Sequence, residues 1–302
     1  MYNRILIPLD GSKTAEKVLP YARYLAATLK LPVELLEVID VAEVARRISP
    51  EKSHFINTVL ENVIRSSEQY LSGVASTFPK ADVKCTVEKG WAEEVIIEKV
   101  EEDKGTLISM ATHGRSGINR WLLGSVAEKV LRGATSPLLL VRAAEEAKTE
   151  GEAPLRSVIV PLDGSELAEQ GLSAVAELAK QLQLEVVLFR AYTIPLSALA
   201  VDPEGYYAVN DEELISALRD EVVAYLEKKS EATKKLGVEK VRYIAKYGIA
   251  ADEIISLGRE TPDNLIAMCT HGRSGVKRWV LGSVTETVVR HSGDPVLVIR
   301  AA

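Results

Sequence analysis

The chain has 302 residues, a length that favours two domains of ordinary size over one. Hydrophobic residues make up 47% of it and charged residues 26%, values typical of folded domains, so disordered, collagenous and low-complexity proteins are excluded. The formal net charge of −6 gives no overall positive field that would gather nucleic acid or an anionic membrane, and we expect neither as a partner.

Strand-like and helical patterns alternate along the first half of the chain. Short runs rich in Val, Ile and Leu predict strands, and apolar residues at helical spacing predict the helices between them. The predicted strands are residues 4–9, 33–38, 83–87, 107–110 and 138–141, and the predicted helices are residues 14–30, 56–75, 92–100 and 125–132. We therefore predict five strands and four helices in each half, because the chain repeats itself.

The repeat is visible in two segments. Residues 5–12 reappear as residues 158–165, and residues 112–132 reappear as residues 270–290 with 15 of 21 positions identical. A polar stretch that ends in Gly151 and Pro154 lies between the copies and is typical of a linker. The predicted domains are residues 1–143 and 155–302, joined by a linker over 144–154.

The alternation predicts an α/β fold. Consecutive strand, helix and strand units form right-handed crossovers, which give a parallel sheet with helices on both faces. We expect two homologous, doubly wound, Rossmann-like domains in tandem, each with a five-stranded parallel sheet.

No stretch of about 18 apolar residues occurs, and residues 1–10 lack a signal-peptide pattern, so we expect no membrane span and no export. The only cysteines, Cys85 and Cys269, are too few for a disulfide framework. A cytoplasmic location is the resulting prediction.

No zinc site is expected, because the four histidines and two cysteines show no metal-binding spacing.

Asp10-Gly11-Ser12 follows the first strand of one copy, and Asp163-Gly164-Ser165 follows that of the other. Open α/β sheets bind ligands beyond the carboxyl ends of their strands, where such a carboxylate can accept hydrogen bonds from a ribose or a base. The alternative is a structural turn in which the aspartate or serine caps the next helix.

A glycine-rich segment follows the fourth strand of each copy. It includes Gly114 and Gly117 and ends at Gly124-Ser125, with nine residues between Gly114 and Gly124. The second copy repeats it from Gly272 to Gly282-Ser283. Glycine lets backbone N–H groups approach a phosphate closely, and a helix that begins there attracts anions. The alternative is that Ser125-x-x-Glu128 and its counterpart are capping boxes.

Histidines precede the first glycine of both segments. His113 and His271 could act as a general base or contact a phosphate, or could hold the loop by hydrogen bonds. The sequence contains neither a Gly-x4-Gly-Lys-Ser/Thr loop nor a Gly-x-Gly-x2-Gly fingerprint, which argues against ordinary NTPases and dinucleotide-dependent dehydrogenases.

Together these motifs resemble the universal stress protein family, twice in tandem. The shared features are a strand that ends in Pro-Leu-Asp-Gly-Ser, the Thr-His-Gly-Arg-Ser-Gly segment, the nine-residue interval before Gly-Ser, and a last Pro-x-Leu-x-Val strand. The resemblance covers nearly the whole chain and is to the members that bind ATP through a Gly-x2-Gly-x9-Gly-Ser/Thr loop. Ala111 and Cys269 stand where that loop has its first glycine.

The resemblance implies ATP in each domain, with Mg²⁺ held mainly by the phosphates. It implies adenine and ribose contacts by Pro8, Leu9, Asp10 and Val38, phosphate contacts by Gly114, Gly124, Ser125 and Val126, and Met110, Ala111 and His113 alongside. The matching positions of the second copy are Pro161, Leu162, Asp163, Ala191, Met268, Cys269, His271, Gly272, Gly282, Ser283 and Val284.

The resemblance also implies a role as a stress-response switch or sensor rather than a fast catalyst. Residues 138–141 are expected to pair antiparallel with residues 296–299, which would make one chain an intramolecular pseudo-dimer, and a homodimer of two chains remains open. The alternatives are a slow ATP-hydrolysing enzyme that uses Asp10 or His113, and a ligand-free interaction scaffold whose glycines are only structural. If the position of that first glycine requires a positive φ, Ala111 and Cys269 both weaken binding. If it requires only a small side chain, Ala111 is harmless and Cys269 crowds the site mildly.

Overall fold

The structure is a computed structural model that describes residues 2–46, 55–113, 123–142, 149–194, 211–270 and 282–300. Each repeat contributes five strands to the described part of the chain. Those of the first repeat are β1 (Arg4–Leu9), β2 (Val33–Ile39), β3 (Val83–Lys89), β4 (Thr106–Ala111) and β5 (Leu138–Val141). Those of the second are β6 (Ser157–Pro161), β7 (Glu185–Tyr192), β8 (Val241–Tyr247), β9 (Asn264–Thr270) and β10 (Val296–Arg300).

Helices separate the strands in both repeats. The first repeat contains the 3-10 helix η1 (Ala15–Val18) and the helices α1 (Leu19–Leu29), α2 (Val41–Arg46), α3 (Ile56–Ala75), α4 (Ala92–Glu102) and α5 (Ser125–Gly133). The second contains α6 (Glu166–Leu182), α7 (Asp211–Lys235), α8 (Ala250–Glu260) and α9 (Ser283–His291). No helix in this part of the chain has the length and low charge that crossing a bilayer requires.

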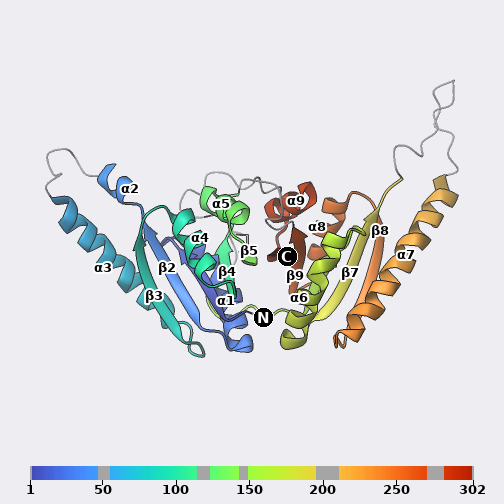
Figure 1. Cartoon of the computed structure of the whole chain (residues 1–302), viewed down its shortest axis with the longest axis horizontal. Coiled ribbons are helices and arrows are strands. Elements are labelled where there is room, and N and C mark those ends of the chain that lie inside the picture. Colours follow the sequence, from blue (N-terminus) through green and yellow to red (C-terminus); the bar gives the residue numbers. More distant parts are fainter. Residues whose placement is uncertain are drawn as a thin grey trace, which may run out of the picture.

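The two repeats share one ten-stranded sheet, in the order β3-β2-β1-β4-β5-β10-β9-β6-β7-β8. Strands within each repeat are parallel, and β5 pairs antiparallel with β10, with Leu139 opposite Leu297. The predicted pairing of the last strands is therefore confirmed. Figure 1 shows this junction at the centre of the molecule, with α3 and α7 at opposite ends.

Two apolar layers hold helices to the sheet. One layer packs α1, α3, α6 and α7 against one face, and the other packs α4, α5, α8 and α9 against the opposite face. Along β2, for example, Leu35 belongs to the first layer and Leu36 to the second, because successive strand residues point to opposite faces. The α/β class with helices on both faces agrees with the sequence prediction.

One predicted helix is wrong in the first repeat. Residues 14–30 do not form a single helix but the short η1 followed by α1, whereas the equivalent α6 is continuous. Pro20 lies in the first turn of α1 and has no N–H for a helical hydrogen bond, while Ser173 occupies the corresponding place in α6. The prediction of four helices per repeat also omitted α2, a short helix that follows β2.

Reciprocal arginines join the two repeats beside the β5–β10 pair. Arg142 at the end of β5 donates to the carbonyl oxygen of His291 in α9 at 3.2 Å, and Arg300 at the end of β10 donates to that of Leu131 in α5. Arginine near a helix C-terminus also interacts favourably with the helix dipole. Each repeat therefore caps a helix of the other.

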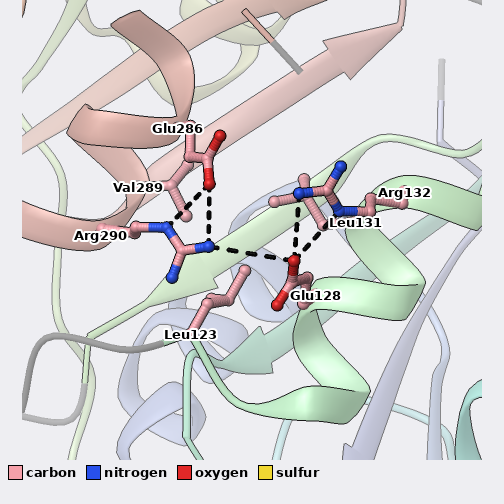
Figure 2. A pocket seen from close by; sticks show the side chains of 7 residues that line it. All are labelled: Leu123, Glu128, Leu131, Arg132, Glu286, Val289 and Arg290. Carbon is pink, nitrogen blue, oxygen red and sulfur yellow. Dashed lines mark hydrogen bonds and ion pairs between the residues drawn. The ribbon is translucent and has the colours of Figure 1, made fainter. Parts of the chain in front are cut away.

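A charged cluster bridges α5 and α9, as Figure 2 shows. Arg132 lies 3.1 Å from Glu128 on α5, and Arg290 lies 2.9 Å from Glu286 on α9. The Arg290 guanidinium also lies 3.9 Å from the Glu128 carboxylate, which links the two helices across the repeats. The two glutamates lie in the first turns of their helices, and each interacts with an arginine in the last turn of the same helix.

Candidate functional site

A cavity of about 1400 Å³ opens at the carboxyl ends of β1, β2 and β4 in the first repeat. The starts of α4 and α5 form one side of it, and α2 and α3 form the other. The described residues that the sequence predicted for this site all line it, namely Pro8, Leu9, Asp10, Val38, Met110, Ala111, His113, Gly124, Ser125 and Val126. Gly114, His271 and Gly272 lie outside the described residues.

Asp10 and Ser12 form a tight turn at the edge of this cavity. The Ser12 hydroxyl donates to Oδ1 of Asp10 at 2.6 Å, and its backbone N–H donates to the same oxygen at 3.0 Å. The Ser12 hydroxyl in turn accepts the N–H of Ala15 at the start of η1. Gly11 between them has φ 77°, which favours glycine. The turn is therefore structural, and it also places the Asp10 carboxyl group at the cavity.

The second repeat builds the same turn. Ser165 donates to Oδ1 of Asp163 from its hydroxyl at 2.6 Å and from its N–H at 2.9 Å, and its hydroxyl caps α6 by accepting the N–H of Ala168. Burial by itself would raise the pKa of Asp163, but the hydrogen bonds from Ser165 and the nearby charge of Arg190 lower it. Asp163 is therefore held as a carboxylate, an acceptor of hydrogen bonds.

The helices α5 and α9 start on glycine rather than serine. Gly124 and Gly282 are the N-cap residues, neither helix has a side-chain cap, and Ser125 and Ser283 are the first helical residues. The capping-box interpretation of these serines is wrong, because a serine inside the first turn cannot accept the N–H that an N-cap serine accepts. Both serines are exposed, and Ser125 lines the cavity.

Neither of these glycines is required by backbone conformation. Gly124 has φ −59° and ψ 147°, and Gly282 has φ −59° and ψ 143°, values that residues with side chains adopt readily. A Cβ on Gly282 would meet no described atom within 4 Å. Because glycine has no side chain, a ligand can approach the free N–H groups at the start of the helix closely.

Ala111 and Cys269 fit their places without strain. They lie in β4 and β9, and neither belongs to the residues with positive φ. The position therefore does not require glycine. The Cys269 thiol is accommodated by Gly171 of α6, where an added Cβ would lie 3.2 Å from the Cβ of Cys269, while the residue matching Gly171 in the first repeat is Val18. The first repeat thus combines the smaller Ala111 in the strand with the larger Val18 in the helix, and the second combines the larger Cys269 with the smaller Gly171.

His113 is held at the cavity by its neighbour. Its Nδ1 lies 3.0 Å from the Thr112 hydroxyl. Its Nε2 is buried and has no hydrogen-bond partner among the described residues. Because an unpartnered buried polar atom is costly, this nitrogen is suited to a ligand that supplies the missing hydrogen bond.

Most of the charged residues in the described lining of the cavity are acidic. It carries five carboxyl groups, from Asp10, Glu37, Asp40, Glu43 and Glu93, and one ammonium group, from Lys129. Lys129 on α5 donates to Glu93 on α4 and lowers the pKa of that carboxyl group, although partial burial opposes the shift. No group of three or more His, Cys, Asp or Glu side chains among the described residues is arranged to hold a metal ion.

Two aromatic residues of the lining were missed by the sequence analysis. Phe55 precedes α3 and Trp91 precedes α4, and their side chains are 51% and 58% exposed. Trp91 follows the predicted strand 83–87, so attention to the residues beyond each strand would have found it. Phe55 comes to the cavity only through the fold. Large exposed aromatic side chains at a cavity are typical of ligand contacts.

The remaining predicted residues of the second repeat occupy equivalent places. Pro161 ends β6 and Leu162 follows it, Ala191 lies near the end of β7, Met268 and Cys269 lie near the end of β9, and Gly282, Ser283 and Val284 begin α9. They lie at the carboxyl ends of the strands, as their counterparts do in the first repeat.

Comparison with known proteins identifies the family of the chain. The model of the universal stress protein family matches residues 1–142 and again residues 154–300. The chain belongs to the universal stress protein family. A universal stress protein of Methanocaldococcus jannaschii is 30% identical over 151 residues, which are 50% of this chain and 85% of that protein.

Other universal stress proteins share the tandem arrangement. One from Mycolicibacterium smegmatis is 22% identical over 300 residues, which are 98% of this chain and 96% of that one. The crystal structure of a universal stress protein from Archaeoglobus fulgidus superposes with a TM-score of 0.68 at 22% identity, and the match covers 100% of both chains. The tandem α/β fold of this universal stress protein is thus a known architecture.

Proposed function

We propose that this universal stress protein binds an adenine nucleotide in the cavity of the first repeat and at the matching place of the second. The nucleotide that we propose is ATP. The observation that carries the proposal is the pair Gly124 and Gly282. Both are N-cap residues of helices, and both have φ and ψ values that residues with side chains also adopt. An added Cβ on Gly282 would meet no described atom within 4 Å. Close approach of a phosphate to the helix start accounts for both glycines.

The rest of the cavity suits the other parts of a nucleotide. Val38, Met110 and Val126 contribute apolar surface from the layer under α4 and α5, which can bury a purine. The Asp10 carboxyl group can accept hydrogen bonds from ribose hydroxyls, as acidic residues do at this edge of related sheets. The Nε2 atom of His113 can complete its hydrogen bonding on a phosphate or base.

The acidity of the lining favours a nucleotide that arrives with a cation. The described part of the lining has five carboxyl groups and one ammonium group, and no cluster of described side chains is arranged to hold a metal ion by itself. Mg²⁺ carried by the phosphates, with exposed Ser125 near them, fits these residues. The cation would neutralise phosphate charge when bound.

We further propose that bound nucleotide acts as a switch in a stress response. Glu128 and Glu286, one turn into α5 and α9, are linked through Arg290 across the repeats. A ligand at the start of either helix therefore acts on a helix that contacts the other repeat. This contact supports a signalling role over rapid turnover.

The test is to release bound small molecules from the purified protein by acid and to count adenine nucleotides per chain. Near two ATP per chain is the expected result, and titration calorimetry with Mg-ATP on the emptied protein should reproduce that number. ADP that accumulates steadily after ATP addition would instead favour the slow hydrolase. If no nucleotide binds even at millimolar Mg-ATP, the proposal is wrong and the glycines are structural.

A further inference from the structure

One position near the end of the second strand carries opposite charges in the two repeats. Glu37 of β2 lies opposite Leu9 of β1. Arg190 of β7 occupies the matching place, because the preceding Phe189 pairs with Pro161 as Leu36 pairs with Pro8. The ladders are in the same register, so the exchange of a carboxylate for a guanidinium is a real difference between equivalent sites.

In the first repeat the surroundings of this position are acidic. Glu37 is only 7% exposed and lines the cavity together with Asp10. Burial raises the pKa of the nearby Tyr70 hydroxyl, and the negative charges of Glu16, Glu37 and Asp10 raise it further. A carboxylate at residue 37 offers no N–H donor to a phosphate on the ribose, whereas a guanidinium at the matching place does.

In the second repeat the arginine lies against the aspartate turn. The place that a Cβ would take on Gly164 is 3.1 Å from both Nη atoms of Arg190. The guanidinium carbon lies 4.7 Å from the centre of the Tyr225 ring, which supports the group from one side. The positive charge of Arg190 also acts on the Asp163 carboxyl group and lowers its pKa.

A lysine also pairs with the glutamate of the next helix, as it does in the first repeat. Lys229 lies 2.5 Å from Glu169, and the Tyr225 hydroxyl donates to the same carboxylate at 2.9 Å. Glu169 corresponds to Glu16 of the first repeat, which lies 2.9 Å from Lys13. Because Lys229 neutralises Glu169, the charge of Arg190 is left to act at the Asp163 turn, where its field lowers the pKa of the carboxyl group.

Related dinucleotide folds show what such an exchange does. In those sheets an acidic residue binds the free hydroxyl of an adenosine ribose, and an arginine near the same place accommodates a phosphate on that ribose. A guanidinium can bind a phosphate through two parallel hydrogen bonds, which adds both affinity and selectivity. By the same chemistry, a guanidinium at residue 190 can bind a ribose phosphate that the carboxylate at residue 37 cannot.

We infer that the two sites of this protein have different specificities. The first site takes an adenine nucleotide with free ribose hydroxyls, and the second takes one that carries an additional phosphate on the 2′ or 3′ oxygen of its ribose. Arg190 is the specificity-determining residue. The inference rests on the proposed nucleotide binding and adds to it the chemical class of ligand for each repeat.

The test measures each site alone in the full-length chain. Gly124→Val closes the first site and leaves the second, and Gly282→Val does the reverse. Each variant is titrated calorimetrically with AMP, adenosine 2′,5′-bisphosphate and adenosine 3′,5′-bisphosphate. The Gly124→Val chain should bind one of the two bisphosphates roughly tenfold or more tightly than AMP, and the Gly282→Val chain should bind AMP at least as tightly as either. The two bisphosphates distinguish a 2′ from a 3′ phosphate.

Substitution of the arginine provides the control. In the Gly124→Val chain, Arg190→Gln should abolish the preference for the bisphosphate and Arg190→Lys should keep part of it, while thermal unfolding shows that both remain folded. Equal binding of AMP and the bisphosphates by the second site, or a preference that survives Arg190→Gln, would overturn the inference and leave nucleotide binding intact. Failure of the unmodified chain to bind any of these nucleotides or ATP would overturn both.

Discussion

Glu34 stabilises the first repeat through a cluster of charges under α4, and its removal should be costly. Its carboxylate lies 2.6 Å from Arg4 and 3.2 Å from Lys99, accepts the Thr86 hydroxyl at 2.9 Å, and is 5% exposed. Glu34→Ala leaves two largely buried cations without this partner, a change that costs about 3 to 5 kcal/mol. We expect about 3 kcal/mol, because Asp103 and Glu88 still lie 3.4 Å from the two cations.

The second repeat supplies a matched control, since it fills the same positions without charge. Replacing the whole cluster by the residues of the second repeat removes the cations together with the carboxylate, so no charge is left buried and alone. Stability should then stay near that of the unmodified protein, as for other buried ion clusters replaced by apolar residues. The variant is Arg4→Ser, Glu34→Val, Thr86→Ile and Lys99→Leu, copied from Ser157, Val187, Ile244 and Leu257.

The assay is urea unfolding followed by circular dichroism, at several pH values. Burial opposes ionisation of Glu34, but the hydrogen bonds of Thr86 and Lys99 lower its pKa below the ordinary 4.5. Its contribution is therefore present above pH 4.5 and is lost as the pH falls through the lower pKa of the folded protein. The difference between Glu34→Ala and the unmodified chain should shrink in that acidic range. Equal stability of the two at pH 7, or a fourfold variant as unstable as Glu34→Ala, would refute the reasoning.

Three further substitutions test other features. Gly73→Ala in the exposed part of α3 should raise the free energy of unfolding by about 0.5 to 1 kcal/mol, because a Cβ there meets no described atom and glycine is a poor helix former; the same change at Gly164, with φ 90°, should lower it by about 1 kcal/mol or more in the same urea titration. Gly282→Val should change the midpoint of thermal unfolding little yet remove one nucleotide per chain from the binding stoichiometry, and two nucleotides bound by this variant would contradict the proposed phosphate position. Arg300→Leu should cost about 2 kcal/mol, since it removes hydrogen bonds of a partly buried cation to Thr270 and, across the repeats, to Leu131; unchanged unfolding would show that this contact does not hold the repeats together.

Most of the secondary structure follows from local patterns in the sequence. The predicted bounds of β1, α3 and β5 match the structure, because buried β-branched runs and a long amphipathic repeat leave few alternatives. The broken helix at Pro20 was also readable, since proline in a helix needs a start or a kink there. By contrast, the N-cap of α5 could not be assigned between Gly124 and Ser125, which both suit a helix start.

The candidate site is predictable to the extent that it lies on strand ends. Asp10 is found from sequence because parallel strands bring their carboxyl ends to one edge, Gly124 because it ends the glycine-rich segment, and Met110 only through the resemblance to the family. Phe55 is not, because it reaches the cavity from α3, a helix that only the tertiary fold places there.

The sequence by itself determined the repeat, the α/β class and the residues at the edge of each sheet, since these depend on periodicity and on neighbours along the chain. Only the tertiary structure decided which charges meet. The sign of residues 37 and 190 is plain in the sequence, but burial and distance are what make Glu37 part of an acidic cavity and place Arg190 against Gly164. Electrostatic interactions depend on separation and on exclusion of water, and neither quantity is local in the chain.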